Sequence, residues 1–236
     1  MIYIIQNDPR VPAGIYGRHL QDRDIPQRTV HLYAGESLPP LTEVSAFIVL
    51  GGYMGVHDEE EYPFLRQLKA FMRRAVEAGT PLLGICLGGQ LLAQVLGGEV
   101  FSRHRGEKGL QEIHLTSVGQ DDPLFAGLPP AFAAFEWHND SFEVPSAAVH
   151  LAASAACPGQ AFRYRNAWGV QFHPEVDREI VSAWSAVVDP AGGYATEFAA
   201  DEAAHRAMAQ RLLKNFLDVA QTAKAQRLLS PARCTR

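Results

Sequence analysis

The stretch PLLGICLGGQ, residues 81–90, decides the fold of this chain. Its apolar start is typical of a short buried strand, and the apolar residues from Leu91 to Leu96 are typical of a helix. Between the two, Cys86 stands in a turn with glycine on both sides, which is the Gly-x-Nuc-x-Gly spacing of a nucleophile elbow. Such a turn is tight and sets its central side chain at a helix N-terminus, where the partial positive charge favours the reactive thiolate form of a cysteine.

The stretch WGVQFHPEV, residues 168–176, supplies the groups that such a cysteine needs. Apolar residues alternate along it, which predicts a strand, and His173 stands at its end, where side chains reach the catalytic edge of an open α/β sheet. A nucleophilic cysteine requires a base, and the base requires an acceptor for its second ring nitrogen. We therefore predict Cys86 as nucleophile, His173 as base and Glu175 as the acid that orients it.

Together these stretches resemble the two signatures of class I glutamine amidotransferases. LGGYMGVHD, residues 50–58, is similar to the family's glycine loop, and HNDSF, residues 138–142, is similar to a His-Gly-Asp-Thr-Phe segment of stand-alone members close to the amidotransferase domain of GMP synthases. The resemblance runs from the first strand to about Val219. The chain departs from the family pattern at Gly89, where many members have histidine, and at Asn139, where glycine is common.

The resemblance implies a reaction and a set of binding residues. The Cys86 sulfur would attack the γ-carbonyl of glutamine, forming a γ-glutamyl thioester and releasing ammonia, with no metal or organic cofactor. The resemblance implies oxyanion-hole N–H groups at Gly52 and Leu87. It also implies substrate-binding residues at Gln90, His138 and Asp140, the last able to pair with a substrate ammonium group.

The destination of the ammonia stays open at this point. The chain contains no synthase domain and no Gly-x-x-x-x-Gly-Lys phosphate loop, so an ammonia-accepting synthase partner would act in trans. Alternatively, the protein is a stand-alone hydrolase of γ-glutamyl peptides or amides. A non-catalytic regulatory module on the same fold is disfavoured because all three triad residues are present. A cysteine peptidase of the wider fold group is disfavoured because Leu87, not histidine, follows the nucleophile.

The order of elements predicts an α/β fold with an open, largely parallel central sheet flanked by helices, which is flavodoxin-like. Strand-like segments at 2–5, 29–33, 46–50 and 81–85 alternate with helical patterns at 63–78 and 87–96. Beyond Gly97, short strand-like segments indicate a partly antiparallel second half; they are 99–102, 110–116, 134–137, 149–153, 160–164 and 168–172. A long amphipathic helix follows. We predict one domain over residues 1–220 and a flexible tail over residues 221–236.

Composition excludes several classes of function. The 236-residue chain has a formal net charge of −5 and no block of basic residues, which argues against nucleic-acid binding. No apolar run approaches the roughly 18 residues of a membrane helix. Three cysteines without pairing or metal spacing indicate a reducing, cytoplasmic location. The histidines outside the motifs are scattered and predict no metal site; they are His104, His114, His150 and His205.

Overall fold

A computed structural model describes residues 1–229 of the chain, with side chains up to residue 225. Its centre is a nine-stranded sheet in the order β2-β1-β3-β4-β11-β10-β9-β6-β7. The strands of this sheet are β1 (Ile2–Gln6), β2 (Gln27–His31), β3 (Ala46–Val49), β4 (Leu82–Ile85), β6 (Glu107–Leu115), β7 (Ala131–His138), β9 (Val149–Ala153), β10 (Ala161–Tyr164) and β11 (Ala167–Val170). A separate two-stranded ribbon pairs β5 (Val100–Phe101) with β8 (Ser141–Phe142).

The sheet is largely parallel with a partly antiparallel second half, as the sequence predicted, and the change comes at β11, which still pairs in parallel with β4. Strands β2, β1, β3, β4 and β11 pair in parallel. From β11 onward, β10, β9, β6 and β7 pair antiparallel. In the parallel half, Val170 of β11 stands opposite Ile85 of β4, and the Val170 carbonyl accepts a hydrogen bond from the Cys86 N–H at 2.8 Å. This pairing places the turn after β4 beside the segment that leads to His173.

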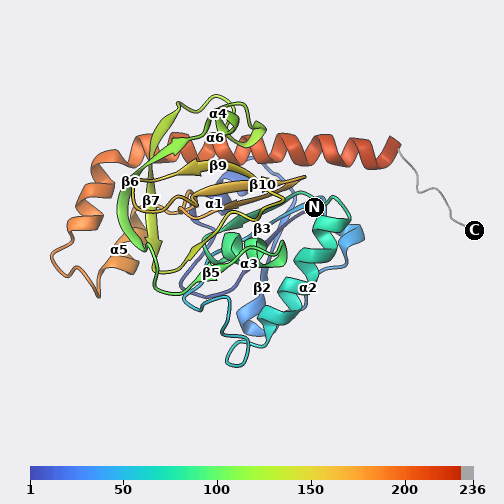
Figure 1. The fold of residues 1–236 in the computed structure, drawn as a ribbon, viewed down its shortest axis with the longest axis horizontal. Coiled ribbons are helices and arrows are strands. Elements are labelled where there is room, and N and C mark those ends of the chain that lie inside the picture. The colour runs from blue at the N-terminus through green and yellow to red at the C-terminus, as the bar shows by residue number, and fades with distance from the viewer. Residues whose placement is uncertain (230–236) are drawn as a thin grey trace, which may run out of the picture.

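Helices cover both faces of the sheet (Figure 1). The helices are α1 (Gly14–Asp22), α2 (Phe64–Glu77), α3 (Leu87–Val95), α4 (Ser117–Gln120), α5 (Arg178–Ser185) and α6 (Gly193–Leu229), with short 3-10 turns η1 (Leu32–Ala34), η2 (Leu41–Glu43) and η3 (Pro123–Phe125). Apolar residues of α1, α5 and α6 pack on one face, and those of α2 and α3 pack on the other. Figure 1 shows α6 running along one side of the sheet with α2 on the opposite side.

Because both faces are covered, successive residues of one strand belong to two different cores. In β1, Ile2 and Ile4 point to the core under α1, α5 and α6, whereas Tyr3 and Ile5 point to the core under α2 and α3. Strands that are buried on both faces consist of nearly continuous apolar residues. The parallel strands could therefore be recognised in the sequence.

The structure corrects the bounds of one predicted strand and describes the first part of the predicted tail. The segment predicted as a strand at 29–33 forms β2 at Gln27–His31 and then turns into η1. Helix α6 runs as far as Leu229, and its apolar stripe extends to the buried Ala223, so the first part of the segment predicted as a flexible tail is helical; its flexibility stays a prediction. The remaining tail residues, 230–236, which include Cys234, lie outside the described residues.

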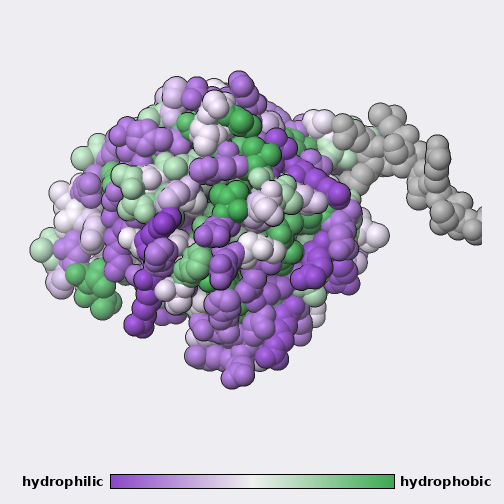
Figure 2. All heavy atoms as spheres, in the orientation of Figure 1, coloured by the Kyte–Doolittle hydropathy of each residue, from purple (hydrophilic) through white to green (hydrophobic). Residues whose placement is uncertain are grey.

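None of the helices within residues 1–229 combines the length and the apolar character needed to cross a bilayer. On the face drawn in Figure 2, apolar residues form small patches separated by hydrophilic ones. Single exposed apolar residues of this kind are normal for a folded protein surface.

One buried histidine of α6 lies under the segment that carries the site. His205 is fully buried, its ring packs edge-on against Phe198 with centroids 4.9 Å apart, and it lies close to the backbone of residues 174–176. Desolvation lowers the pKa of His205 from 6.5 to about 4. The unfolded chain therefore binds a proton at this residue between pH 6.5 and pH 4, where the folded protein does not.

This difference makes the stability of the fold depend on pH. The contribution of neutral His205 to the free energy of unfolding is fully present above pH 6.5 and is lost as the pH falls towards 4. At pH 5 the free energy of unfolding is lower by about 2 kcal/mol for this reason. We expect urea unfolding to show that the loss of unfolding free energy between pH 8 and pH 5 is smaller by about this amount in His205→Leu than in the wild type. The exposed control His114→Leu should keep the wild-type pH dependence, and an unchanged pH dependence in His205→Leu would contradict the interpretation.

Candidate active site

Cys86 occupies a sharp, strained turn between β4 and α3. Its backbone has φ 51° and ψ −110°, a conformation that residues other than glycine rarely adopt, and it is the N-cap of α3. The flanking glycines are required by space: a Cβ on Gly84 would lie 2.4 Å from the Gly88 carbonyl oxygen, and a Cβ on Gly88 would lie 2.1 Å from the Val49 carbonyl oxygen. The chain therefore forms the elbow that its glycine spacing predicted.

His173 and Glu175 form a buried pair. Nδ1 of His173 lies 2.7 Å from Oε1 of Glu175, so the carboxylate accepts the Nδ1–H and leaves Nε2 for another partner. The ring of Trp184 meets the His173 ring edge-on with centroids 4.9 Å apart, and the Trp184 indole N–H donates to the Arg10 carbonyl at 2.7 Å. The orientation of the imidazole is thus fixed by a hydrogen bond and by an aromatic contact.

The structure brings Cys86 and His173 together at one cavity. A Cβ built on Gly51 would lie 3.1 Å from Cε1 of His173 and 3.5 Å from Cβ of Cys86, so both side chains flank the same glycine. Burial by itself opposes a charge on His173, but the Glu175 carboxylate and the Cys86 sulfur outweigh it and raise the pKa of His173 well above its usual value. The site therefore favours a protonated imidazole beside the cysteine.

The cavity at this point is small, with a volume of about 120 Å³. Its walls come from the loop after β3, the start of α3, the end of β7 and α5. The lining includes Cys86, His173, Gln90, Trp184 and residues 137–140. A cavity of this size holds several water molecules and admits a small polar group.

Of the two residues expected to form the oxyanion hole, one lines this cavity and the other lies next to it. Gly52 lines the cavity from the loop after β3, and Leu87 follows Cys86 as the first residue of α3. The N–H of the first helical residue has no partner inside its own helix. The two positions are neighbours, since a Cβ on Gly52 would lie 2.8 Å from Cδ2 of Leu87.

The three residues expected to bind substrate form one hydrogen-bonded wall of the cavity. The Gln90 amide donates to the Asp140 carbonyl at 3.1 Å and to Oε1 of Gln171 at 3.2 Å. Nδ1 of His138 lies 2.8 Å from the same Asp140 carbonyl. The Asp140 carboxylate accepts a hydrogen bond from the Arg103 N–H at 2.8 Å. The structure thus brings Gln90, His138 and Asp140 together, with both nitrogens of the His138 ring facing other protein groups.

Several residues around the site were not recognised from the sequence. Trp184 on α5 contacts His173, and Trp137 and Tyr53 line the cavity. Tyr16 on α1 is fully buried, and burial followed by the charge of Glu175 raises its pKa well above the ordinary value. A signal for α5 was present, because Asp177 is its N-cap and accepts a hydrogen bond from the Ile180 N–H at 2.9 Å.

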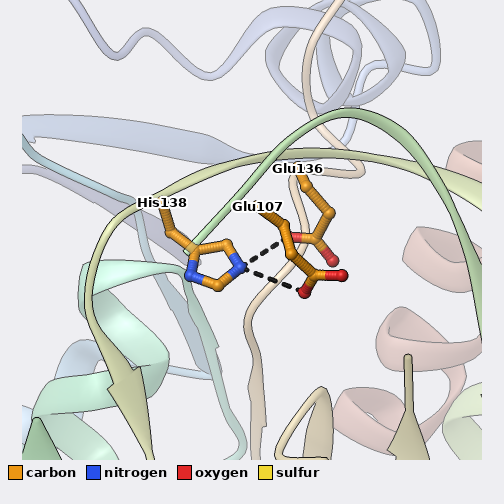
Figure 3. A group of neighbouring side chains, drawn as sticks. All are labelled: Glu107, Glu136 and His138. Carbon is orange, nitrogen blue, oxygen red and sulfur yellow. Dashed lines mark hydrogen bonds and ion pairs between the residues drawn. The ribbon is translucent and has the colours of Figure 1, made fainter. Parts of the chain in front are cut away.

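A second group of ionisable side chains includes His138 of the cavity wall, and the sequence did not predict that two glutamates would join that histidine. Glu107, Glu136 and His138 point toward one another in the protein interior (Figure 3). Burial, and next the neighbouring Glu107 carboxylate, raise the pKa of Glu136 well above its usual range.

Known proteins share both the sequence pattern and the fold of this chain. Residues 20–180 match the family model described as glutamine amidotransferase class-I. YfeJ, a glutamine amidotransferase-like protein of Salmonella typhimurium, is 33% identical over 185 residues, which cover 76% of this chain and 77% of YfeJ. One subunit of the glutamine-hydrolyzing GMP synthase of Pyrococcus abyssi is 41% identical over 103 residues, 42% of this chain and 53% of that subunit.

The solved structures agree with these relatives. A glutamine amidotransferase from Thermotoga maritima has a TM-score of 0.83 at 28% identity, covering 91% of this chain and 96% of the other. A glutamine amidotransferase from Methylobacillus flagellatus has a TM-score of 0.81 at 28% identity, covering 92% and 94% of the two chains. The likeness therefore includes α6 and the antiparallel half of the sheet as well as the segment with the motifs.

Proposed function

Because the chain belongs to the class I glutamine amidotransferase family, we propose that it hydrolyses the γ-amide of glutamine through a γ-glutamyl thioester on Cys86 and releases ammonia. One observation carries the proposal. The strained elbow at Cys86 and the hydrogen-bonded pair His173 and Glu175, 2.7 Å apart, meet at a single small cavity. A nucleophile, a base and an orienting acid in this arrangement are the parts that acyl transfer requires.

The first half of the reaction uses the charge on His173. The Cys86 sulfur attacks the γ-carbonyl carbon, and the carbonyl oxygen becomes an oxyanion that accepts hydrogen bonds from the N–H groups of Gly52 and Leu87. Each such donor is worth about 3 kcal/mol in comparable sites. The C–N bond then breaks while the His173 imidazolium gives its proton to the departing nitrogen, which leaves as ammonia. A raised pKa of His173 supports this role, because the proton is in place before attack.

The second half regenerates the cysteine. Neutral His173 takes a proton from a water molecule that attacks the thioester carbon, the C–S bond breaks, and glutamate leaves with the sulfur restored. Throughout, Glu175 holds the Nδ1–H of His173, so that Nε2 faces the reacting atoms. A thiolate is a good leaving group, so the protein needs no further catalyst for this step.

Substrate recognition is proposed for the wall formed by Gln90, His138 and Asp140. Gln90 lines the cavity directly and is held by the Asp140 carbonyl. Asp140 lines the cavity, and its carboxylate would pair with the α-ammonium group of a substrate. His138 contributes its ring surface, since both of its nitrogens face other protein groups.

A direct test compares the two described cysteines. Cys157 is buried, and desolvation raises the pKa of its thiol to about 11, so it stays protonated and inert at neutral pH. We expect Cys86→Ser to lower glutaminase activity at least about a thousandfold, while Cys157→Ala keeps activity within about twofold. Cys234→Ala, in the segment outside the described residues, serves as a second control. Ammonia release from glutamine is the measurement, and an active Cys86→Ser protein would refute the assignment.

The fate of the ammonia separates two versions of the proposal. Several relatives are named as single subunits of a glutamine-hydrolyzing GMP synthase, which favours an ammonia-consuming partner that acts in trans. The alternative, a stand-alone γ-glutamyl hydrolase, is favoured by the His173–Glu175 pair, which is already assembled without a partner.

Kinetics with and without captured partners distinguish these versions. If a partner completes the site, turnover of glutamine alone should be slow and should rise at least about tenfold when the captured partner fraction is added back. Activity would be measured on glutamine and on a panel of γ-glutamyl peptides and amides. Full activity on one of these compounds, without capture or stimulation by any partner, would exclude the coupled version.

A further inference from the structure

The buried group formed by Glu107, Glu136 and His138 has a geometry that the proposed reaction does not use. Glu136 and His138 lie two residues apart on one face of β7, and Glu107 on β6 is the register partner of His138. The side chains of Glu107, Glu136 and His138 are 4%, 0% and 1% exposed. Figure 3 shows both carboxyl groups pointing toward the same nitrogen of the imidazole.

The hydrogen bonds fix which nitrogen of His138 carries a proton. Nδ1 lies 2.8 Å from the Asp140 carbonyl oxygen, which can only accept, so Nδ1 is the donor. In the neutral ring, Nε2 then presents a lone pair. This nitrogen lies 3.4 Å from Oε2 of Glu107 and 3.4 Å from Oε2 of Glu136. Three electron-rich atoms therefore converge on one buried point.

Glu136 lacks the partners that a buried carboxylate requires. It is fully buried, and by distance and angle neither of its oxygens accepts a hydrogen bond within the described part of the chain. The nearby Gln160 amide, which slightly offsets the burial-driven rise in the pKa of Glu136, donates its hydrogen bond to Glu107 instead. Its only recorded ion-pair neighbour there is His138. Buried polar atoms are nearly always hydrogen-bonded, and buried charges are paired or bound to a metal ion. The orphaned carboxylate, aimed into the cluster, points to a missing cation.

We propose that Glu107, Glu136 and His138 bind one divalent transition-metal ion of the Zn²⁺ class. Bonds of about 2.0–2.2 Å in a tetrahedral site separate the ligand atoms by roughly 3.3–3.6 Å, and the two recorded separations from Nε2 are 3.4 Å. All three ligand atoms lie within 4.8 Å of one another. Two carboxylates and a neutral imidazole also balance a dication. An imidazole ligand favours zinc and its neighbours over magnesium or calcium.

The surroundings of the cluster match those of known metal sites. Oε1 of Glu107 accepts a hydrogen bond from the Ser154 hydroxyl at 2.7 Å, and Oε2 accepts one from the Gln160 amide at 2.7 Å. The His138 N–H on the far side of its ring donates to a backbone carbonyl, the usual arrangement for a ligating histidine.

A bound ion would brace the wall of the substrate cavity. The Asp140 carbonyl that accepts from His138 also accepts from Gln90, so the ion, His138, Asp140 and Gln90 would form one chain of contacts. The ligands of this site are not separated by any familiar spacing in the sequence. The sequence analysis predicted no metal site because it considered the spacing of the scattered histidines, and such spacing does not show which side chains meet between β6 and β7.

The experiment uses the full chain with Cys86→Ser as background, because a reactive cysteine would itself bind zinc. We expect metal-free Cys86→Ser protein to bind one equivalent of Zn²⁺ with submicromolar affinity, measured by competition with a chromophoric chelator. Adding Glu136→Gln, which keeps the shape of the side chain, should weaken binding at least about a hundredfold. Glu112→Gln, an exposed position on the same β6 strand, is the matched control and should bind as the background does.

Two further measurements keep the test decisive if a variant folds poorly. Co²⁺ bound to the Cys86→Ser background should show the visible bands of a tetrahedral site with nitrogen and oxygen ligands, without a thiolate charge-transfer band. Zn²⁺ should also raise the thermal midpoint of that background but not that of the Glu136→Gln variant. Absence of stoichiometric binding, equal affinity in Glu136→Gln, or a thiolate band would overturn the proposal. The proposal would also be overturned if the protein bound no ion and the Glu136→Gln variant were more stable than the background. The cluster would then hold a buried proton instead of a metal ion.

Discussion

The parallel pairing of β4 with β11 is the constraint on which the rest of the site depends. It sets Val170 opposite Ile85 and joins the Cys86 N–H to the Val170 carbonyl at 2.8 Å, so two distant parts of the chain end at the same edge of the sheet. The strained turn at Cys86 and the exit of the chain toward His173 then follow from local geometry. Parallel pairing of this kind needs a core on both faces, which α1, α5 and α6 provide on one side and α2 and α3 on the other.

Burial gives the carboxylates near this edge different roles. Glu175 has a hydrogen-bonded partner in His173, and its charge keeps that imidazole protonated beside the cysteine. Glu136 is equally buried but has no hydrogen-bond partner among the described residues. The same low-polarity interior therefore strengthens the hydrogen bond between Glu175 Oε1 and His173, and it leaves the Glu136 carboxyl group in need of a proton or a cation. His138 belongs both to this buried group and to the wall that it forms with Gln90 and Asp140, so the group and the substrate cavity share a residue.

The sequence allowed the elbow and the His173–Glu175 pair to be predicted because their signals are local. Glycines flank Cys86, and Glu175 is two residues from the histidine that it holds. Helix α1 was missed because its N-terminus has no side-chain cap and only Ile15, Tyr16 and Leu20 are buried. The meeting of Glu107 with His138 depends on the register between β6 and β7, which is decided by the packing of the whole sheet.

The central claim is that Cys86 carries the atom that attacks a γ-carbonyl, and covalent labelling tests it most directly. The wild-type chain would be treated with a glutamine analogue that carries a diazo-ketone in place of the carboxamide, and peptide mass spectrometry would locate the adduct. The account predicts one adduct, on the peptide that contains Cys86, which excess glutamine prevents and Cys86→Ser abolishes. An adduct on Cys157, or labelling that glutamine does not slow, would contradict it.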